Sequence, residues 1–365
     1  MMHSGKRFVM AVALVALIIG FFFPMQVSAK DKVYELTFAW NDIWGPKFRA
    51  SQVYKPCGEM ERMVEERTNG RVKLKIISRM FPTNQLLESV ATGKADMADL
   101  AMPWLSGTYP LLNWGIIPNI VDQDPVKALG EELAVYEDPK VVELMDERLK
   151  EVNLKFWFAT QWDPANGIWS KKKITSLDDI QGMKMSVAGG FYGNMGVKAW
   201  GGSAVAITSA ELAPAMMTGT VDAVLTSLGY GYSIGLAEVS DYYTLTPLNP
   251  TWTAMTVINR KTFESMPEDL QKTLMEVGRE LQRMVSLSTT AEYVMSLDTV
   301  ALSGVERKAL PKAEYEKALE KAKVVEEKWL EETGKKGEEM LKAVRGAVED
   351  YRSFCQEFHC AMKVA

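Results

Sequence analysis

Histidine is almost missing from this sequence, since the 365 residues include only His3 and His359. Both lie near the ends of the chain, so the long stretch between them offers no imidazole. Histidine-based triads, most zinc sites and most imidazole proton relays are therefore excluded from the interior of the protein. The absence of the commonest catalytic side chain favours a binding protein over an enzyme.

Cysteine is also scarce, and the chain contains only Cys57, Cys355 and Cys360. In an oxidising compartment we expect the last two either to pair across a short loop or to remain inert thiols, with Cys57 buried and free. His359 lies beside Cys360, yet three candidate ligands at a chain end are a weak metal signature. We therefore expect neither a metal nor a cofactor.

The chain has no excess of positive charge, because 42 basic residues stand against 47 acidic ones. Nucleic-acid binding needs clustered positive charge, so we do not expect a nucleic acid as partner. Long repeats and low-complexity stretches are missing as well, which argues against a structural or adhesive protein.

Only one stretch is apolar over a long distance, and it lies at the N-terminus. Lys6 and Arg7 precede an apolar run over residues 8–23, and residues 27–29 (Val-Ser-Ala) supply the small side chains that signal peptidases require. The run is shorter than the roughly 20 residues of a spanning helix, so a retained anchor is the weaker alternative. We predict a signal peptide over residues 1–29, export to the periplasm and a soluble mature protein without a lipid anchor.

Short patterns typical of strands alternate with longer patterns typical of helices. Residues 34–38, for example, alternate polar and apolar side chains as a half-buried strand does. Such alternation predicts an α/β protein with mostly parallel sheets, and the chain length predicts two lobes. The predicted strands cover residues 34–38, 72–76, 95–100, 154–159, 183–187, 204–207 and 223–226, and the predicted helices cover residues 46–69, 82–92, 191–200 and 209–218.

Two ten-residue segments resemble each other. Residues 87–96 and 213–222 both contain a helical stretch, a Thr-Gly pair and, after two more positions, an aspartate that precedes an apolar strand. Glycine permits the left-handed conformation that ends a helix. Every helix-to-strand junction shares some of these features, but the likeness favours two equivalent lobes. In this interpretation Asp96 and Asp222 cap turns where their strands start.

The C-terminal third reads as helical throughout. Residues 267–303 predict one long helix, either straight or bent at Gly278. Two apolar stripes follow, and we expect both to pack on the protein's own core, with an intermolecular coiled coil as the alternative. The first stripe contains Tyr315, Leu319, Ala322, Val325 and Trp329, and the second contains Met340, Leu341, Val344, Val348 and Tyr351.

Several of these segments resemble one known family. Residues 59–76 and 85–98, the lysine-rich hairpin and strand over residues 170–185, the Thr-Gly-x-x-Asp junction in residues 212–222, and Gly304-Val-Glu306 appear in the order of motifs of solute-binding proteins from tripartite ATP-independent periplasmic (TRAP) transporters. The resemblance runs from about residue 33 to about residue 329. Each motif alone is weak, but their order and spacing together are specific.

The resemblance implies a two-lobed periplasmic binding protein of the type II-like class, with hinge strands and a long helix spanning both lobes. It implies a small-molecule ligand enclosed between the lobes and membrane subunits that move it on an ion gradient, typically of sodium. Monomers and dimers both occur in the family. The expected divisions are lobe I over residues 30–156 and about 250–285, lobe II over residues 157–249 and about 286–330, and a C-terminal helical extension over residues 331–365.

The chain departs from the family where the ligand is usually held. Family members carry an arginine four residues after the glycine of the central signature, where it clamps a carboxylate, and this position is Ser186. A hydroxyl offers neither the charge nor the fork geometry of guanidinium. A second family arginine falls near Asn166, and a family asparagine falls near Thr226. Lys184, Arg49 and Arg79 are the candidate substitutes, and the sequence does not choose among them.

Aromatic and polar residues at the predicted strand ends are the candidate ligand contacts, because ligands bind where strands of α/β sheets end. They favour an aromatic or neutral ligand. A cationic amine in an aromatic cage, or a carboxylate held by other groups, are the alternatives. The candidates are Trp40, Asn41, Trp44, Gln161, Trp162, Asn166, Ser186, Tyr192, Thr226, Ser227 and Trp252.

Two other functions fit the same sequence. The receptor could deliver its signal to a sensor kinase instead of a permease, and nothing in the residues separates these roles. A periplasmic enzyme working through carboxylates is the less favoured alternative, because Asp96, Asp99 and Asp222 are not paired by any motif.

Overall fold

The computed structural model of the chain describes residues 32–40, 56–105, 107–122, 124–162, 166–187, 190–208, 211–248 and 253–364. The predicted signal peptide and the first part of the predicted helix over residues 46–69 lie outside these ranges. The chain divides into the units Met1–Val33 and Tyr34–Ala365, and the description below concerns the second.

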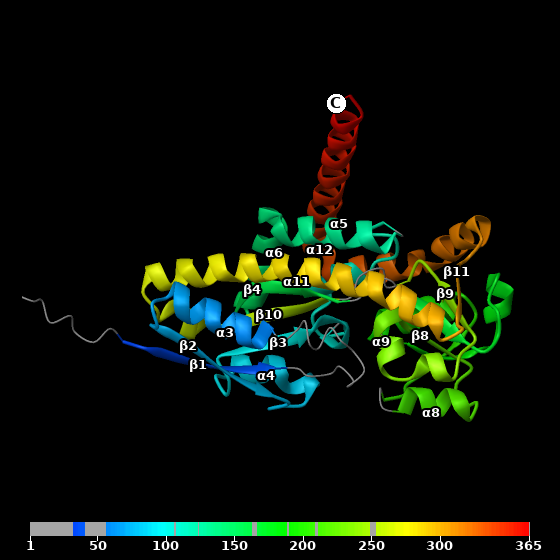
Figure 1. The fold of residues 1–365 in the computed structure, drawn as a ribbon, viewed down its shortest axis with the longest axis horizontal. Coiled ribbons are helices and arrows are strands. Elements are labelled where there is room, and N and C mark those ends of the chain that lie inside the picture. The colour runs from blue at the N-terminus through cyan, green and yellow to red at the C-terminus, as the bar shows by residue number, and fades with distance from the viewer. Residues whose placement is uncertain are drawn as a thin grey trace, which may run out of the picture. The chain divides into compact units, whose positions relative to one another are not determined.

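The first sheet has five strands in the order β2-β1-β3-β10-β4 (Figure 1). β1 runs parallel to β2 and β3, whereas β10 runs antiparallel to β3 and β4. The strands are β1 (Tyr34–Trp40), β2 (Val72–Ser78), β3 (Met97–Ala101), β4 (Leu154–Gln161) and β10 (Thr253–Asn259), and the helices along this part of the chain are α3 (Pro56–Arg67), α4 (Leu86–Ala91), α5 (Pro125–Glu137), α6 (Pro139–Lys150) and α10 (Arg260–Glu264).

The second sheet has six strands in the order β11-β9-β5-β8-β6-β7. Here β5 is the strand that runs antiparallel to its two neighbours, β8 and β9. The strands are β5 (Asn166–Ser170), β6 (Lys184–Val187), β7 (Ser203–Val205), β8 (Ala223–Ser227), β9 (Tyr242–Leu245) and β11 (Glu306–Ala309), and the accompanying helices are α7 (Gly190–Ala199), α8 (Leu212–Met217) and α9 (Leu228–Ser233).

Among the described strands, each sheet contains one antiparallel strand, β10 in the first and β5 in the second, and the other strands of each sheet run in one direction. The prediction of mostly parallel sheets is therefore confirmed, with one reversed strand in each sheet. The antiparallel strands β10 and β5 are the first strands after the chain passes from one sheet to the other. The link over residues 162–165 between β4 and β5 is too short to cross a whole sheet, because an extended residue spans at most about 3.6 Å. β5 must therefore begin at the edge where β4 ended.

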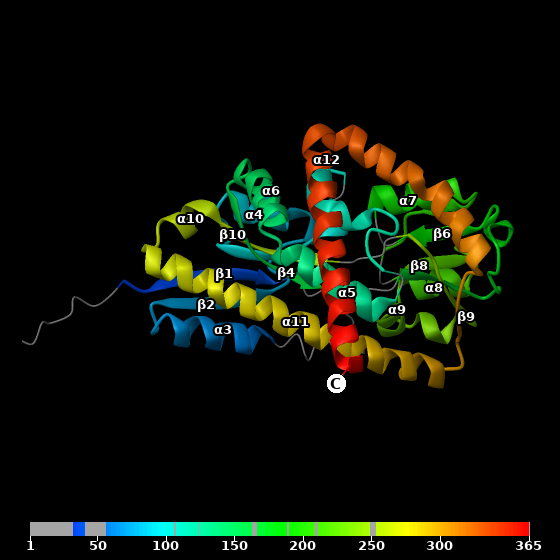
Figure 2. The ribbon, with the colours of Figure 1, turned by 90° about the horizontal axis from the view of Figure 1, so that it is seen from above.

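The long helix α11 (Glu268–Leu302) serves both sheets (Figure 2). Leu274 and Leu281 pack in the apolar core of the first sheet, and Tyr293 and Val300 pack in that of the second. The helix is continuous through Gly278, where an added Cβ would lie 2.6 Å from the Trp157 ring. Gly278 therefore permits close packing of the helix on the sheet. Of the two predicted alternatives, a straight helix or one bent at Gly278, the structure shows the helix without a break.

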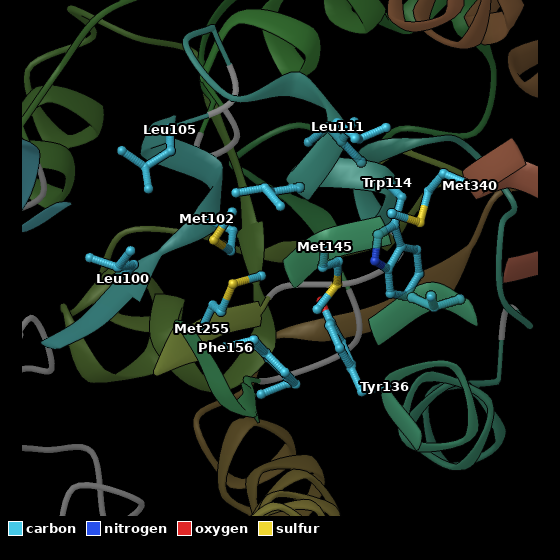
Figure 3. Packing of buried hydrophobic residues seen from close by; sticks show 14 of the residues in the cluster. Leu100, Met102, Leu105, Leu111, Trp114, Tyr136, Met145, Phe156, Met255 and Met340 are labelled. Carbon is cyan, nitrogen blue, oxygen red and sulfur yellow. The ribbon is translucent and has the colours of Figure 1, made fainter. Parts of the chain in front are cut away.

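The last helix, α12 (Lys312–Val364), contains non-helical dihedral angles at Gly334, where φ is 58° and ψ is −142°. Before this kink, Ala318 and Ala322 join the core of the second sheet. After it, Met340 joins the largest core cluster together with Trp114 (Figure 3). The prediction that both stripes pack on the protein's own core is confirmed.

The alternative in which Cys355 and Cys360 pair across a short loop is wrong about the loop, because both residues lie in the helix α12. Cys355 is a free thiol. The division of the chain into lobes at residue 156 stays a prediction, although all of β4 from Leu154 to Gln161 belongs to the first sheet.

Candidate functional site

The C-terminal ends of the parallel strands define one edge of each sheet, which we call the carboxyl edge. In the first sheet, β1 ends at Trp40, β3 at Ala101 and β4 at Gln161. Thr253, the first residue of β10, pairs with Gln161 and therefore lies at the same edge. Two of the predicted ligand contacts, Trp40 and Gln161, are thus on the first carboxyl edge.

The second carboxyl edge is built in the same way. β6 ends at Val187 and β8 ends at Ser227. Asn166, the first residue of β5, pairs with Ser227 because β5 and β8 are antiparallel. Ser186, level with Val224 of β8, lies one residue before the end of its strand. The predicted contacts Asn166, Ser186 and Ser227 are therefore on this edge.

The two carboxyl edges are connected and share an apolar cluster. The chain passes from Gln161 to Asn166 through residues 162–165. The shared cluster takes residues from both edges and from α11, and it consists of Ala101, Trp162, Tyr230, Ala254 and Val285 with the partly buried Trp40 and Ile234. Ligands of α/β sheets bind outside the carboxyl ends of the strands, so this junction is the candidate site. Asn41, Trp44 and Trp252 lie outside the described residues.

Two hydroxyl groups at the end of β8 distinguish the second edge. The side chains of Thr226 and Ser227 are each 0% exposed. Neither Thr226 Oγ1 nor Ser227 Oγ has a hydrogen-bond partner within the part of the chain that the structure describes. Their backbone is nevertheless held firmly, since Trp169 Nε1 donates to the Ser227 carbonyl at 3.2 Å and the Tyr243 hydroxyl donates to the Thr226 carbonyl at 3.4 Å.

Leaving a buried hydroxyl without a partner costs about 1–3 kcal/mol. A bound molecule that supplies hydrogen bonds would recover this free energy. Ser186 lies on the same sheet face as Thr226, because its strand β6 pairs with β8 in register with Val224 and side chains alternate along a strand, whereas Ser227 pairs with Asn166 of β5. Ser186, Val224 and Thr226 are consequently on one face of the sheet, and Ser186 is itself buried.

A buried carboxyl lies behind the first edge. Glu132 of α5 is 0% exposed, accepts a hydrogen bond from the Thr253 hydroxyl, and has no partner for Oε2 among the described residues. Burial raises the pKa of Glu132 to about 8, against the opposing effect of hydrogen bonds from Thr253 and Gln161. The carboxyl is therefore mainly neutral at pH 7. Gln161, a predicted ligand contact, donates from Nε2 to the Leu129 carbonyl at 3.0 Å.

Sequence reasoning did not find Glu132. It lies in the first helix after a stretch of 3-10 turns, and its neighbours Ala128, Leu129 and Val135 are buried apolar residues. An acidic residue in register with an apolar helix face is the signal that could have identified it.

Tyr192 is buried, but its hydroxyl points to α12. It donates to Glu332 Oε2 at 2.5 Å, and the ring belongs to the core cluster that contains Trp329 and Met340. Burial and the hydrogen bond to Glu332 raise the pKa of Tyr192 well above its ordinary value. The hydroxyl of this predicted ligand contact is thus already used to hold the C-terminal helix.

The candidate substitutes for the family arginine differ in position. Lys184 is exposed at the start of β6, at the far end of that strand from the carboxyl edge, and donates from Nζ to the Gly219 carbonyl at 2.8 Å. Arg79 directly follows β2, with φ 54°, and its backbone N–H donates to the Trp40 carbonyl at 3.0 Å. Arg79 is therefore at the first carboxyl edge, Lys184 is not, and Arg49 lies outside the described residues.

Comparison with known proteins places these features in a family. The sequence profile described as "Bacterial extracellular solute-binding protein, family 7" matches residues 49–333. A solute-binding protein of Albidiferax ferrireducens is 29% identical over 231 residues, which covers 60% of this chain and 64% of that protein. The chain thus spans just under two thirds of that relative.

Within the described residues, no helix is long and apolar enough to cross a membrane.

Solved structures show the same fold. A TRAP periplasmic solute-binding protein from Desulfovibrio salexigens with bound orotic acid has a TM-score of 0.74 at 22% identity, covering 87% of this chain and 99% of that one. A Bordetella pertussis extracytoplasmic solute receptor binding pyroglutamic acid has a TM-score of 0.73 at 18% identity, covering 86% of this chain and 100% of that one. The predicted two-lobed α/β class is confirmed by these likenesses.

Proposed function

The chain belongs to family 7 of the bacterial extracellular solute-binding proteins, and on this basis we propose that it is the extracytoplasmic receptor of a TRAP transporter. In this proposal it captures one small organic molecule between the carboxyl edges of its two sheets and delivers it to the membrane subunits. The family resemblance that the motifs indicate is confirmed by the match over residues 49–333. Membership in a family of binding proteins supports a role without catalysis, and the predicted leader supports a periplasmic location.

The observation that carries the proposed ligand chemistry is the pair of buried hydroxyls at the end of β8. Thr226 Oγ1 and Ser227 Oγ are fully buried and lack partners among the described residues. Ser186, on the sheet face of Thr226, and Asn166, which pairs with Ser227, occupy the positions where the resemblance places arginines. Hydroxyl and amide groups can donate to and accept from a neutral polar group, but they cannot neutralise a buried carboxylate.

The solved neighbours carry organic acids, namely orotic acid and pyroglutamic acid, so the proposed ligand of this chain differs from theirs in charge. Trp162, Tyr230 and Trp40 supply rings and apolar surface at the junction of the edges. A ring-containing or otherwise largely apolar solute with one neutral hydrogen-bonding group fits this combination best.

The first test is native mass spectrometry of the purified protein, followed by denaturation and identification of any released molecule. A thermal-shift screen then compares matched pairs in which a ring carries either a carboxylate or a neutral amide. We expect the neutral member of a pair to stabilise the protein more. Stabilisation by carboxylates alone would contradict the proposed ligand chemistry but not the receptor function, whereas no stabilisation by any small molecule would count against both.

Two substitutions connect the ligand to the hydroxyls. Thr226→Val and Ser227→Ala should each weaken binding of the identified ligand by about 5- to 150-fold, the equivalent of about 1–3 kcal/mol for a buried hydrogen bond. Thr273→Val is the matched control, because the Thr273 hydroxyl donates at 2.9 Å to the Asp269 carbonyl of its own helix. Affinity unchanged in the two edge variants, measured by calorimetry, would remove the hydroxyls from the site.

A further inference from the structure

The second half of α11 exposes an apolar face to solvent. Its members follow helical spacing, and the larger ones are extensively exposed, with Leu287 at 72% and Leu302 at 90%. Ala291, also exposed, lies at the middle of the row. We call this set the outer apolar face, and it consists of Met284, Leu287, Ala291, Val294, Met295 and Leu302.

The same helix provides an internal contrast. Its inner side is ordinary, because Val285, Tyr293 and Val300 are buried against the cores. The outer side of the first half is charged, with Lys272, Glu276, Arg279 and Arg283 exposed. Between residues 284 and 302 the charged residues are only Glu292, which is buried, and Asp298. A helix that covers a core is normally polar on its outer side.

Scattered apolar side chains on a surface need no explanation, but a group of exposed apolar side chains gathered on one helix face marks an interaction site, and here Asp298 is the one exposed charged residue among them. At 1.5 Å per residue, the row from Met284 to Leu302 extends for about 27 Å. The row does not belong to the candidate ligand site, since the residue that α11 contributes there is Val285 on the inner side. The outer apolar face is therefore a surface for a partner other than the ligand.

The pattern of the face is complementary to itself. Leu287 and Met295 lie one turn on either side of Ala291, and the small side chain of Ala291 permits two helices to approach closely. In an antiparallel pair with a two-fold axis near Ala291, Leu287 of one copy faces Val294 and Met295 of the other. A two-fold interface always pairs a patch with itself in this way.

The charges beside the face, at Arg283, and within it, at Asp298, are complementary as well. Arg283 lies eight positions before Ala291 and Asp298 lies seven positions after it. The same two-fold axis thus brings Arg283 of one copy opposite Asp298 of the other at both ends of the row. Arg283 already pairs with Glu137, from Nε at 2.5 Å and from a terminal nitrogen at 3.1 Å. A guanidinium group has five N–H donors, so a further partner is available to it.

We propose that the outer apolar face of α11 binds the same face of a second copy of this chain, forming a two-fold symmetric dimer with antiparallel α11 helices. A contact made chiefly by one helix from each copy is small, and small interfaces are typical of weak association. The dimer therefore forms reversibly, and its population rises with protein concentration.

Sedimentation velocity of the purified protein over a hundredfold range of concentration tests this proposal. We expect a concentration-dependent shift from monomer to dimer, and we expect Leu287→Asp to weaken the association at least tenfold. Lys272→Asp is the matched control, since it places the same residue on the exposed charged part of the same helix. Circular dichroism and thermal melting of both variants establish that they are folded.

A charge exchange separates the proposed geometry from non-specific apolar association. Asp298→Arg should weaken the dimer by placing two arginines opposite each other, and the double variant with Arg283→Asp should restore it. A wild-type protein that stays monomeric throughout, or a Leu287→Asp variant that associates like the wild type, would overturn the proposal. If that variant instead keeps wild-type self-association but lowers uptake in cells with the membrane subunits, the face binds those subunits and the dimer is rejected.

Discussion

The starts of β3 and β8 are built alike, although they belong to different sheets. At the first, Asp96 N–H donates to the Thr37 carbonyl at 3.0 Å and its Oδ2 accepts from Thr37 N–H at 2.8 Å. At the second, Asp222 N–H donates to the Lys184 carbonyl at 2.8 Å and its Oδ2 accepts from Lys184 N–H at 2.8 Å. In each sheet one aspartate joins the start of a strand to its parallel neighbour.

The helices that precede these strands also end alike. Thr92 and Thr218 each donate from the side-chain hydroxyl to a carbonyl four residues earlier, at 2.7 and 3.0 Å. Gly93 and Gly219 follow with φ of 78° and 74°. The predicted internal likeness is therefore a structural one, and both aspartates are occupied by it, which removes them as candidates for carboxylate catalysis.

The opposite ends of the same two strands differ. β3 ends at Ala101, which packs in the apolar cluster at the junction, whereas β8 ends in Thr226 and Ser227 with buried hydroxyls. The hydrogen-bonded starts hold each sheet together, while the carboxyl ends are free to vary without breaking those bonds. Function is carried by sites on a fold rather than by the fold itself. In β8 the start of the strand stabilises the fold, and the carboxyl end provides the candidate site.

The largest expected effect is on the pH dependence of stability, and it comes from Glu132, the buried acid behind the first carboxyl edge. The pKa of Glu132 is raised from 4.5 to about 8, so the folded protein keeps a proton that the unfolded chain releases. Stability due to this group is full below about pH 4.5 and is lost as the pH rises toward 8, by up to about 1.4 kcal/mol per pH unit. Glu132→Gln should therefore flatten the decline of the unfolding free energy over this range.

Urea unfolding at pH 5, 6, 7 and 8 measures this dependence. Glu143→Gln is the control, because Glu143 is exposed and pairs with Lys140 on the surface. Asp99 contributes a similar decline at lower pH, since burial raises its pKa to about 7. If the Glu132→Gln and wild-type curves run parallel from pH 5 to pH 8, Glu132 is not a buried neutral acid in the folded state.

Features that depend on local chemistry were predictable from the sequence. Thr-Gly followed by aspartate specifies a helix end and a strand start in a few residues, and both copies were found. β10 was not among the predicted strands, and its antiparallel direction was not predictable either, because its neighbours β3 and β4 lie about a hundred or more residues away along the chain. Periodicity identifies a strand but carries no information about its partners.

In the candidate site, too, features set by local sequence were predictable and features set by distant contacts were not. Thr226 and Ser227 could be found because they end a recognisable strand that follows the Thr-Gly-x-x-Asp junction. The engagement of Tyr192 with Glu332 could not, since the two residues are 140 positions apart and meet only when α12 packs against α7. Side chains near a strand end can turn toward a distant element, and the sequence does not record which way they turn.

An intermediate effect is expected when the aspartates at the strand starts are removed. Asp96 is partly buried and also accepts from the Thr262 hydroxyl at 3.2 Å, whereas the exposed Asp222 side chain accepts, among the described residues, from Lys184 N–H alone. Asp96→Ala should therefore destabilise the protein by about 2 kcal/mol and Asp222→Ala by about 1 kcal/mol. Asp350→Ala, on the exposed side of α12, serves as control in denaturant unfolding. Equal losses at the two positions would mean that the extra bond of Asp96 does not contribute to stability.

The smallest effect tests the likeness of the two helix ends directly. An added Cβ at Gly93 or Gly219 would meet no atom within 4 Å, so Gly→Ala costs only the left-handed backbone conformation, about 1 kcal/mol at each position. Gly346→Ala is the opposite control, because its added Cβ also meets no atom but the residue lies within α12, where alanine should stabilise the helix by about 0.5–1 kcal/mol. Thermal melting should show two matching decreases and one increase. A decrease at Gly93 without one at Gly219 would limit the likeness to sequence and hydrogen bonds, and would indicate that only one of the two helices needs its glycine to end.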